Sequence, residues 1–299
     1  MPTIRTPTKT PTRTVTEAPA RALWVMGDVH GALEPLRRLL ERAGLLGTAG
    51  TWAGGDAELV FLGDYLDRGP DGAGVVRLVR ALEAQAPAQG GRVTALLGNH
   101  EVMFLAAARF RDGDPRDRLG FALHWEGNGG QPHDLAALTP DDLDWLAARP
   151  ALARRGRWLL LHADAAFYAA LGPDLDTANA EVRRRLSGLD PATWTSFSNA
   201  FVERLQFAAP GGEARAGALL AQFGGECLVH GHTPVPLLWE ALLGDEPPGD
   251  LGNAPVLYAG GRAVGVDGAL AYRPGAGFLL RLGERAPAGV VTLVGEGGV

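Results

Sequence analysis

Three short apolar runs in the first third of the chain alternate with stretches of helical spacing. The runs cover residues 22–26, 58–62 and 92–97, and each is followed by a glycine and then directly by an aspartate or asparagine. Between them, apolar residues recur every three or four positions in residues 32–43 and 75–82, the period of a helix with one buried face. This alternation predicts parallel strands joined by right-handed helical crossovers.

The rest of the chain predicts a helical insertion and further strands. Residues 111–155 predict a helical cap, after which an apolar run at 157–161 returns to the sheet. Residues 174–224 predict two or three helices, with a Ser/Thr-rich turn near Trp194. Glycine-rich turns then separate short apolar runs, which predicts hairpins of a second sheet at residues 256–258, 263–266, 278–280 and 290–293. The expected fold class is α/β, a two-sheet β-sandwich flanked by helices in four layers, with a helical cap insertion.

Composition narrows the class of protein. The 299 residues are 46% hydrophobic and 21% charged, which is ordinary for a globular protein, so residues 21–299 are expected to form one domain. The formal net charge of −6 counts against a nucleic-acid partner or an anionic membrane surface. No apolar run reaches the ~18 residues of a membrane span. Residues 1–20, rich in Thr, Pro and Arg, predict a disordered tail without the apolar centre of a signal peptide.

The single cysteine, Cys227, excludes a disulfide within the chain and fits a reducing compartment. A cytoplasmic location is therefore expected. The sequence leaves the oligomeric state open.

Side chains typical of metal sites follow the apolar runs. Such side chains stand at the ends of five of them: Asp28 and His30, Asp64, Asn99, His162, and His232. In open α/β sheets the ligand crevice lies beyond the carboxyl ends of the strands, so these residues are expected to converge. Any one motif alone is more typical of a turn or a buried histidine. Their joint occurrence at successive strand ends favours a metal centre.

Two ligand sets follow from this arrangement. One set is Asp28, His30 and Asp64, and the other is Asp64, Asn99, His162 and His232. If Asp64 belongs to both, two divalent cations would lie ~3.5–4 Å apart, an arrangement that activates water for the cleavage of phosphate esters. Oxygen and imidazole ligands suit manganese first, with iron or zinc as alternatives.

Three of these motifs carry a family resemblance. Gly-Asp-Val-His-Gly (27–31), Gly-Asp-Tyr-Leu-Asp-Arg-Gly (63–69) and Gly-Asn-His-Glu (98–101) resemble the signatures of calcineurin-like metallophosphoesterases. More narrowly, the Asp-Arg-Gly ending is similar to the bacterial branch of the phosphoprotein phosphatase family of serine/threonine phosphatases. Trp125, followed by Asn-Gly-Gly at 128–130, also looks like the cap segment of bacterial members. The resemblance spans about residues 22–282.

The resemblance implies catalytic roles. His100 would be the general acid that protonates the leaving oxygen, and Asp67 would hydrogen-bond to it. Arg68 and Asn99 would bind the substrate phosphate. Leu97 stands where family members often have a phosphate-binding arginine. A further arginine is therefore expected in the helical part, with Arg183, Arg184 and Arg185 as candidates.

Other positions depart from the family or leave two interpretations open. Ala163-Asp164 follows His162 where many relatives have two glycines, and Pro234 stands where many carry a second histidine. His230 is expected to support the site or simply to pack. Asp267 resembles a site-supporting residue, but a hairpin turn explains it equally well.

The main hypothesis is a dinuclear metal-dependent phosphoesterase that hydrolyses phosphomonoesters, first of all phosphoserine and phosphothreonine in proteins. A small phosphoester is the other expected substrate. A diadenosine-tetraphosphate hydrolase of the same superfamily is the alternative; its second motif usually lacks the acidic residue before Arg-Gly, so Asp67 favours the phosphatase. A non-catalytic binding protein is disfavoured because every ligand position is filled. A nuclease is disfavoured by the net acidity.

Overall fold

Two five-stranded sheets form the centre of the computed structural model, which describes residues 21–110, 120–244, 253–273, 275–284 and 287–292. In spatial order the first sheet consists of β10 (Pro287–Thr292), β9 (Phe278–Leu282), β1 (Leu23–Met26), β2 (Glu58–Phe61) and β3 (Arg92–Ala95). The second consists of β4 (Leu152–Arg155), β5 (Trp158–Leu161), β6 (Cys227–Pro234), β8 (Ala263–Asp267) and β7 (Val256–Tyr258).

The predicted parallel strands are present. β1 pairs with β2 and β2 with β3 in parallel, through the crossover helices α1 (Leu33–Arg42) and α2 (Gly72–Gln85), with a 3-10 turn η1 (Ala86–Gln89) after α2. α2 begins at Gly72, before the predicted range 75–82, because the Asp71 side chain accepts the N–H of Gly74 at 2.7 Å and caps the helix. In the second sheet β5, β6 and β8 are also parallel neighbours. The carboxyl ends of β1, β2 and β3 therefore lie at the same end of the first sheet, and those of β5, β6 and β8 lie at the same end of the second.

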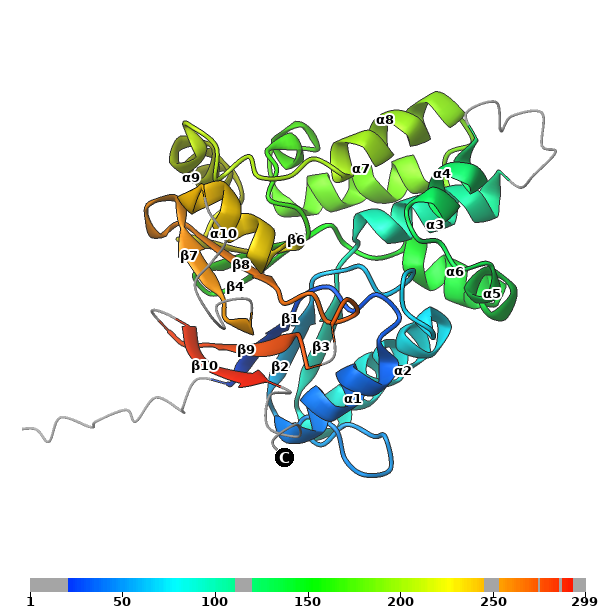
Figure 1. Cartoon of the computed structure of the whole chain (residues 1–299), viewed down its shortest axis with the longest axis horizontal. Coiled ribbons are helices and arrows are strands. Elements are labelled where there is room, and N and C mark those ends of the chain that lie inside the picture. Colours follow the sequence, from blue (N-terminus) through cyan, green and yellow to red (C-terminus); the bar gives the residue numbers. More distant parts are fainter. Residues whose placement is uncertain (1–20, 111–119, 245–252, 274, 285–286, 293–299) are drawn as a thin grey trace, which may run out of the picture.

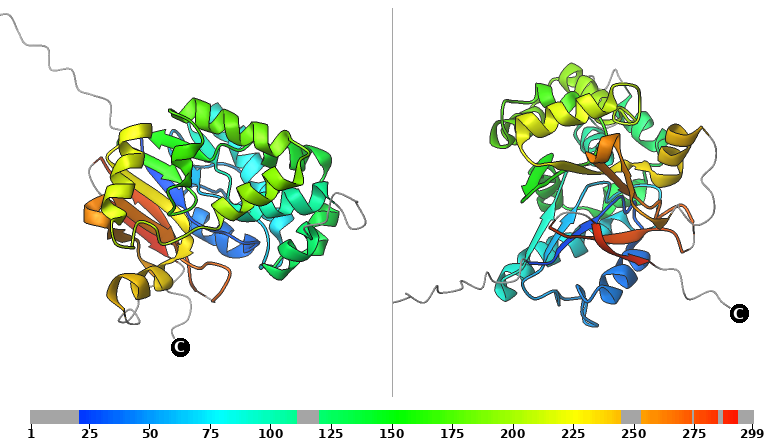
Figure 2. Two further views of the ribbon diagram at one scale, coloured as in Figure 1. Left: turned by 90° about the horizontal axis from the view of Figure 1, so that it is seen from above. Right: turned by 90° about the vertical axis from the view of Figure 1, so that its left-hand side faces the viewer.

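Helices cover both outer faces and one end of the molecule. α1 and α2 lie on the first sheet, and α9 (Gly212–Phe223) and α10 (Val235–Leu243) lie on the second (Figure 1). The others gather beyond the strand ends, as Figure 2 shows from above: α3 (Asn99–Arg109), α4 (Phe121–Gly127), α5 (Pro132–Ala137), α6 (Pro140–Ala147), the 3-10 turn η2 (Phe167–Ala170), α7 (Leu175–Ser187) and α8 (Pro191–Phe201). The predicted α/β sandwich with a helical cap is confirmed. α10 was not predicted.

The C-terminal strands divide between the two sheets, whereas the sequence predicted that all belong to the second. β7 and β8 join the second sheet, but β9 crosses to the first and pairs antiparallel with β1. β1 has β2 on one side only, so its other edge needs a partner for its backbone groups. The buried residues Phe278, Leu279 and Leu280 meet that need and extend the core.

The predicted turn near Trp194 is wrong, because that residue lies inside α8. The helix begins at a strong N-cap: the Asp190 carboxylate accepts the N–H groups of Ala192 and Thr193. Trp194, Phe197 and Phe201 share one buried face at helical spacing. Capping and aromatic burial therefore outweigh the modest helix propensity of the Ser and Thr residues.

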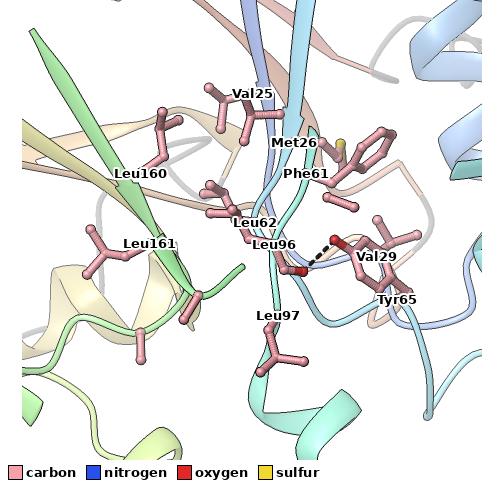
Figure 3. Close-up of a cluster of buried hydrophobic side chains, with 14 of the residues drawn as sticks. Val25, Met26, Val29, Phe61, Leu62, Tyr65, Leu96, Leu97, Leu160 and Leu161 are labelled. Atoms are coloured by element: carbon pink, nitrogen blue, oxygen red, sulfur yellow. Dashed lines mark hydrogen bonds between the residues drawn. The ribbon is translucent and has the colours of Figure 1, made fainter. Parts of the chain in front are cut away.

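An apolar layer lies between the sheets, directly beneath the strand ends. Figure 3 shows Leu62 and Leu96 of the first sheet near Leu160 and Leu161 of β5, all fully buried. The Tyr65 hydroxyl donates to the Leu96 carbonyl at 2.6 Å, so its polar end is satisfied. This layer gives the loops above it a closely packed base.

The remaining sequence expectations concern the tail, the domain, the cap and membrane spans. The predicted tail, residues 1–20, lies outside the described residues. The extent of the single domain stays a prediction. In the described part, β4 forms within the range predicted for the cap. None of the helices described is both long and apolar enough to span a bilayer.

Candidate metal centre

Six side chains from distant loops meet at the carboxyl ends of β1, β2, β3 and β5 and within β6. All six are nearly or fully buried: Asp28, His30, Asp64, Asn99, His162 and His232. The structure therefore brings together every residue that the sequence named as a metal ligand. Two groups of side chains at this place have ligand atoms close enough to hold an ion. One is His30, Asp64 and His100, the last of which is not among the six, and the other is Asp64, His162 and His232.

Distances between ligand atoms fit these two positions. His30 Nε2 lies 3.5 Å from Asp64 Oδ2 and 3.8 Å from Asp28 Oδ2. His162 Nε2 lies 3.4 Å from Asp64 Oδ1 and 2.9 Å from Asn99 Oδ1. Ligands with bonds of about 2.1 Å to one ion lie roughly 3.0–3.5 Å apart. Asp64 offers one oxygen to each group.

Backbone carbonyls fix which nitrogen of each histidine faces the centre. The donated N–H groups are His30 Nδ1 to Leu66 at 3.0 Å, His162 Nδ1 to Leu62 at 3.0 Å, and His232 Nε2 to Val202 at 3.3 Å. The other nitrogen then carries no proton and can bind a metal as neutral imidazole, although His30 Nε2 accepts from Arg68 in this structure. Burial lowers the pKa of all three rings, that of His162 to about 3, which keeps them neutral.

The buried carboxylates of this site carry more negative charge than its cationic side chains can neutralise. Burial raises the pKa of Asp28 and Asp64 well above the usual range, and the charges of Asp267 and Glu101 respectively raise them further. The Arg68 guanidinium offsets this only in part. Buried charges are stable when they are paired or coordinate metals. The donor set and its excess of acid therefore fit divalent cations.

Glu101 connects the β2 and β3 loops and is itself fully buried. Its carboxylate accepts the backbone N–H groups of Asp64 and Tyr65, both at 2.8 Å, and of Gly98 at 3.0 Å. A side chain at Gly98 would place its Cβ 2.2 Å from Asp64 Oδ1, so glycine is required there. The sequence motif contains Glu101, but only the structure explains it as the group that holds Asp64.

His100 and Asp67 form a buried pair beside the two groups. His100 Nδ1 lies 2.6 Å from Asp67 Oδ2, and its Nε2 faces the centre, 4.0 Å from Asp64 Oδ2. Burial raises the pKa of Asp67 to about 8 and lowers that of His100. Desolvation thus disfavours a charged imidazolium and a charged carboxylate side by side.

Arg68 reaches over the centre from the surface. Its Nη1 donates to His30 Nε2 at 2.6 Å and also to the hydroxyl of Tyr272. The Tyr272 ring is about half exposed and lies 5.3 Å from the guanidinium carbon. The Arg68 side chain is therefore held beside the site by His30 and Tyr272, which come from two different loops.

The three arginines named as candidates for a second phosphate contact all lie on α7. Arg184 and Arg185 pair with Glu181 of the same helix, at 2.6 and 2.8 Å, and Arg183 is exposed. Arg204, which follows α8, lies close enough for its charge to lower the pKa of His30, His162 and His232. No motif surrounds Arg204, so only the fold reveals it.

Asp164 holds the segment that carries Arg204. Its carboxylate accepts the N–H of Leu205 at 2.8 Å and the hydroxyl of Thr233 at 2.6 Å. Leu205 has φ +61°, a left-handed conformation that costs a non-glycine residue about 1–2 kcal/mol. The aspartate in place of a family glycine thus links the loops after β5 and α8 to the end of β6.

The two ambiguous residues have distinct surroundings. His230 is buried, with Nε2 2.7 Å from the Tyr258 hydroxyl on β7, so it braces β6 from behind the centre. Asp267 has contacts that fit both interpretations. It accepts the N–H of Ala269 in the turn, and its carboxyl group is hydrogen-bonded to Asp28.

Comparison with known proteins agrees with this geometry. The sequence profile described as calcineurin-like phosphoesterase matches residues 22–236. The symmetrical bis(5'-nucleosyl)-tetraphosphatase of Bordetella parapertussis is 31% identical over 185 residues, which are 58% of each chain. Shewanella-like protein phosphatase 2 of Arabidopsis thaliana is 38% identical over 87 residues, 29% of this chain and 22% of that protein.

A solved structure extends the likeness to most of the fold. A cold-active protein-tyrosine phosphatase of a Shewanella species superposes with a TM-score of 0.68 at 23% identity, covering 91% of this chain and 80% of that one. At this identity the likeness concerns the fold alone. The chain spans 58% of the length of the first of these curated relatives.

Proposed function

Because the chain belongs to the calcineurin-like phosphoesterase family, we propose that it is a metal-dependent phosphatase that hydrolyses phosphomonoesters. Phosphoserine and phosphothreonine in proteins are the proposed substrates. The observation that carries this proposal is the His100–Asp67 pair, 2.6 Å apart and buried beside the two candidate ion positions.

The distances support a set of metal ligands. Asp28, His30 and Asp64 would hold one ion, and Asp64, Asn99, His162 and His232 the other. His100 also reaches the first group, but its Nε2 is 4.0 Å from Asp64 and its other nitrogen is engaged with Asp67, so we keep it for proton transfer. Two bound divalent ions, with manganese proposed first, would lower the pKa of water and polarise the phosphoryl oxygens.

His100 serves the leaving group. Its Nδ1 is held by Asp67, which leaves Nε2 directed at the space where an ester oxygen would depart. An alkoxide is a poor leaving group, and its protonation by a positioned acid typically contributes 10²–10⁴-fold to the rate. Serine and threonine phosphates release such an oxygen.

Arginine and amide groups bind the phosphate. Arg68 has a planar fork that can donate two parallel hydrogen bonds to phosphoryl oxygens. Arg204 would supply positive charge from the opposite, helical side of the site, and the Asn99 side chain contributes from the end of β3. Together these groups would hold the phosphate at the centre and stabilise the charge that develops on its oxygens.

A symmetrical dinucleoside tetraphosphatase is the second candidate, because by sequence one such relative matches 58% of this chain, whereas Shewanella-like protein phosphatase 2 matches 29%. That reaction expels a nucleotide phosphate, which leaves readily without protonation. A buried general acid such as the His100–Asp67 pair would therefore accelerate that reaction little. The pair therefore supports the phosphomonoesterase.

The remaining expectations are part of the proposal. Cys227 is a free buried thiol, which fits a reducing cytoplasm. The acidic net charge fits a phosphoprotein or small phosphoester better than a nucleic acid.

One comparison of substrates tests the proposal. Purified protein with added Mn²⁺ would be assayed on phosphoserine, phosphothreonine and phosphotyrosine peptides, p-nitrophenyl phosphate and diadenosine tetraphosphate. We expect phosphate release from the serine and threonine peptides, abolished by Asp64→Ala. Nucleotide release from diadenosine tetraphosphate with no peptide activity would establish the second candidate instead.

A further inference from the structure

The segment Trp125–Gly130 of the cap contacts two residues of the proposed site. The indole N–H of Trp125 donates to Asp67 Oδ1 at 2.7 Å. The carbonyl of Gly129 accepts the backbone N–H of Arg68 at 2.8 Å. Both contacts cross from the end of α4 to the loop after β2, about 60 residues earlier in the chain.

The conformation of that loop makes these contacts informative. Asp67 and Arg68 both have left-handed backbones, with φ +71° and +64°. Such a pair of non-glycine residues costs about 1–3 kcal/mol each and persists only where the surroundings impose it. The Gly129 carbonyl supplies one of those constraints, because it binds the backbone N–H of Arg68.

The segment itself is shaped to reach the loop. The carbonyl of Trp125 accepts the N–H groups of Asn128 and Gly130, both at 3.0 Å, which turns the chain back over the indole. Gly129 has φ +97°, and a Cβ there would lie 2.8 Å from Cγ of Arg68. A Cβ at Gly130 would lie 2.4 Å from the Trp125 ring. The two glycines thus permit contacts that any side chain would block.

Asp67 needs the indole because it is fully buried. One carboxylate oxygen faces His100, and the other would have no donor without Trp125. An unsatisfied buried oxygen is costly, and the carboxylate would turn to find another donor. The orientation of His100 would be lost with it.

We propose that Trp125 is a positioning residue for the general acid His100, acting through Asp67, and that Gly129 positions Arg68. The cap segment 125–130 would thus fix the orientation of both the proton donor and the phosphate-binding arginine. This inference rests on the proposed phosphatase function. It gives a role to the one sequence motif that the metal centre does not use.

The test is the dependence of the rate on the leaving group. Trp125→Phe keeps the ring but removes the donor. We expect kcat on a phosphoserine peptide to fall ~10–100-fold, the usual range for loss of an outer hydrogen-bond partner, and kcat on p-nitrophenyl phosphate to fall much less. Trp194→Phe is the matched control, because this second buried indole donates to Gly188 away from the site. It should leave the ratio of the two rates unchanged.

Two further measurements make the result decisive. In an Asp67→Asn background Trp125→Phe should have no additional effect on the ratio, since coupled residues are not additive. Gly129→Ala should raise KM for both substrates without changing the ratio, and it tests the segment even if Trp125→Phe does not fold.

Several results would overturn the inference. An equal loss on both substrates in folded Trp125→Phe, or full additivity with Asp67→Asn, would refute the role of Trp125. An unchanged KM in Gly129→Ala would refute the role of the segment. If the wild-type protein hydrolyses neither substrate, the proposed function itself fails, which is a different outcome.

Discussion

Asp64 presents one carboxylate oxygen, Oδ1, to His162 Nε2 at 3.4 Å and turns its other oxygen towards His30. Glu101 fixes this orientation by binding the backbone N–H of Asp64. No other carboxylate among the described residues belongs to both groups that could hold an ion. Asp64 should therefore matter to both ions, whereas Asp28 should matter to one.

Metal content distinguishes these two aspartates. Asp64→Ala should reduce the bound metal from about two ions per chain to nearly none, because a shared carboxylate contributes to both sites. Asp28→Ala should leave about one. Elemental analysis of proteins purified in Mn²⁺ and then dialysed measures this directly. Retention of two ions by Asp64→Ala would show that the carboxylate does not bridge.

Loss of the proposed acid should depend on the substrate. His100→Asn keeps a polar side chain but cannot donate a proton, so kcat on an alkyl phosphate should fall ~10²–10⁴-fold. On p-nitrophenyl phosphate, whose leaving group needs little protonation, the loss should be smaller. Steady-state rates on the two substrates provide the comparison, and equal losses would remove His100 from the acid role.

Arg204 should act on phosphate binding. Arg204→Ala removes the positive charge beside the histidines, so KM and the inhibition constant of inorganic phosphate should both rise, about 10-fold if one charge-assisted hydrogen bond of ~1.5 kcal/mol is lost. Asp164→Ala should have the same direction of effect, because it releases the segment at Leu205. Arg183→Ala, on the exposed face of α7, is the control. Unchanged phosphate inhibition in Arg204→Ala would exclude the contact.

Cys227 reports on the integrity of the fold. The thiol is buried, and burial raises its pKa to about 11 from an ordinary value of 9.0. The native protein should therefore react slowly with a thiol reagent such as 5,5'-dithiobis(2-nitrobenzoate) at pH 8, and unfolding in urea should release one fast-reacting thiol. A fast reaction of the native protein would contradict the burial of β6.

The same pKa has a consequence for stability at high pH. Because folding raises this pKa, the unfolded chain loses its proton first, and the folded state loses stability as the pH rises from about 9 to 11. Urea unfolding at pH 8 and pH 10.5 should show a larger decrease for the wild type than for Cys227→Ala, by about 1–2 kcal/mol. Identical decreases would mean that the thiol is already exposed.

The first half of the fold could be predicted because its signals are local. The run at 58–62 and the Gly-Asp that ends it lie within a few residues of each other, so they locate both β2 and Asp64. The strand at 278–282 could not be assigned in this way. Its pattern shows that it is buried, but its choice of β1 over the second sheet depends on an open edge more than 250 residues away.

The supporting residues show the same limit. Trp125 was recognised only as part of a motif, and Asp164 only as a departure from one, because their partners Asp67 and Leu205 lie about 60 and 40 residues away. Arg204 belongs to no pattern at all. Hydrogen bonds and charges across such separations leave no periodicity in the chain.

By itself the sequence determined the kinds of candidate ligand and their order, since all but His232, which lies within β6, follow a strand whose apolar run can be recognised. The tertiary structure decided which groups hold the side chains of the site in place. Glu101 binds the backbone of Asp64, Trp125 donates to Asp67, and Asp164 binds the segment that carries Arg204. A strand end is fixed by neighbours in the chain. The donor that satisfies a buried carboxylate is whichever group the packing brings within about 3 Å, and that depends on the whole fold.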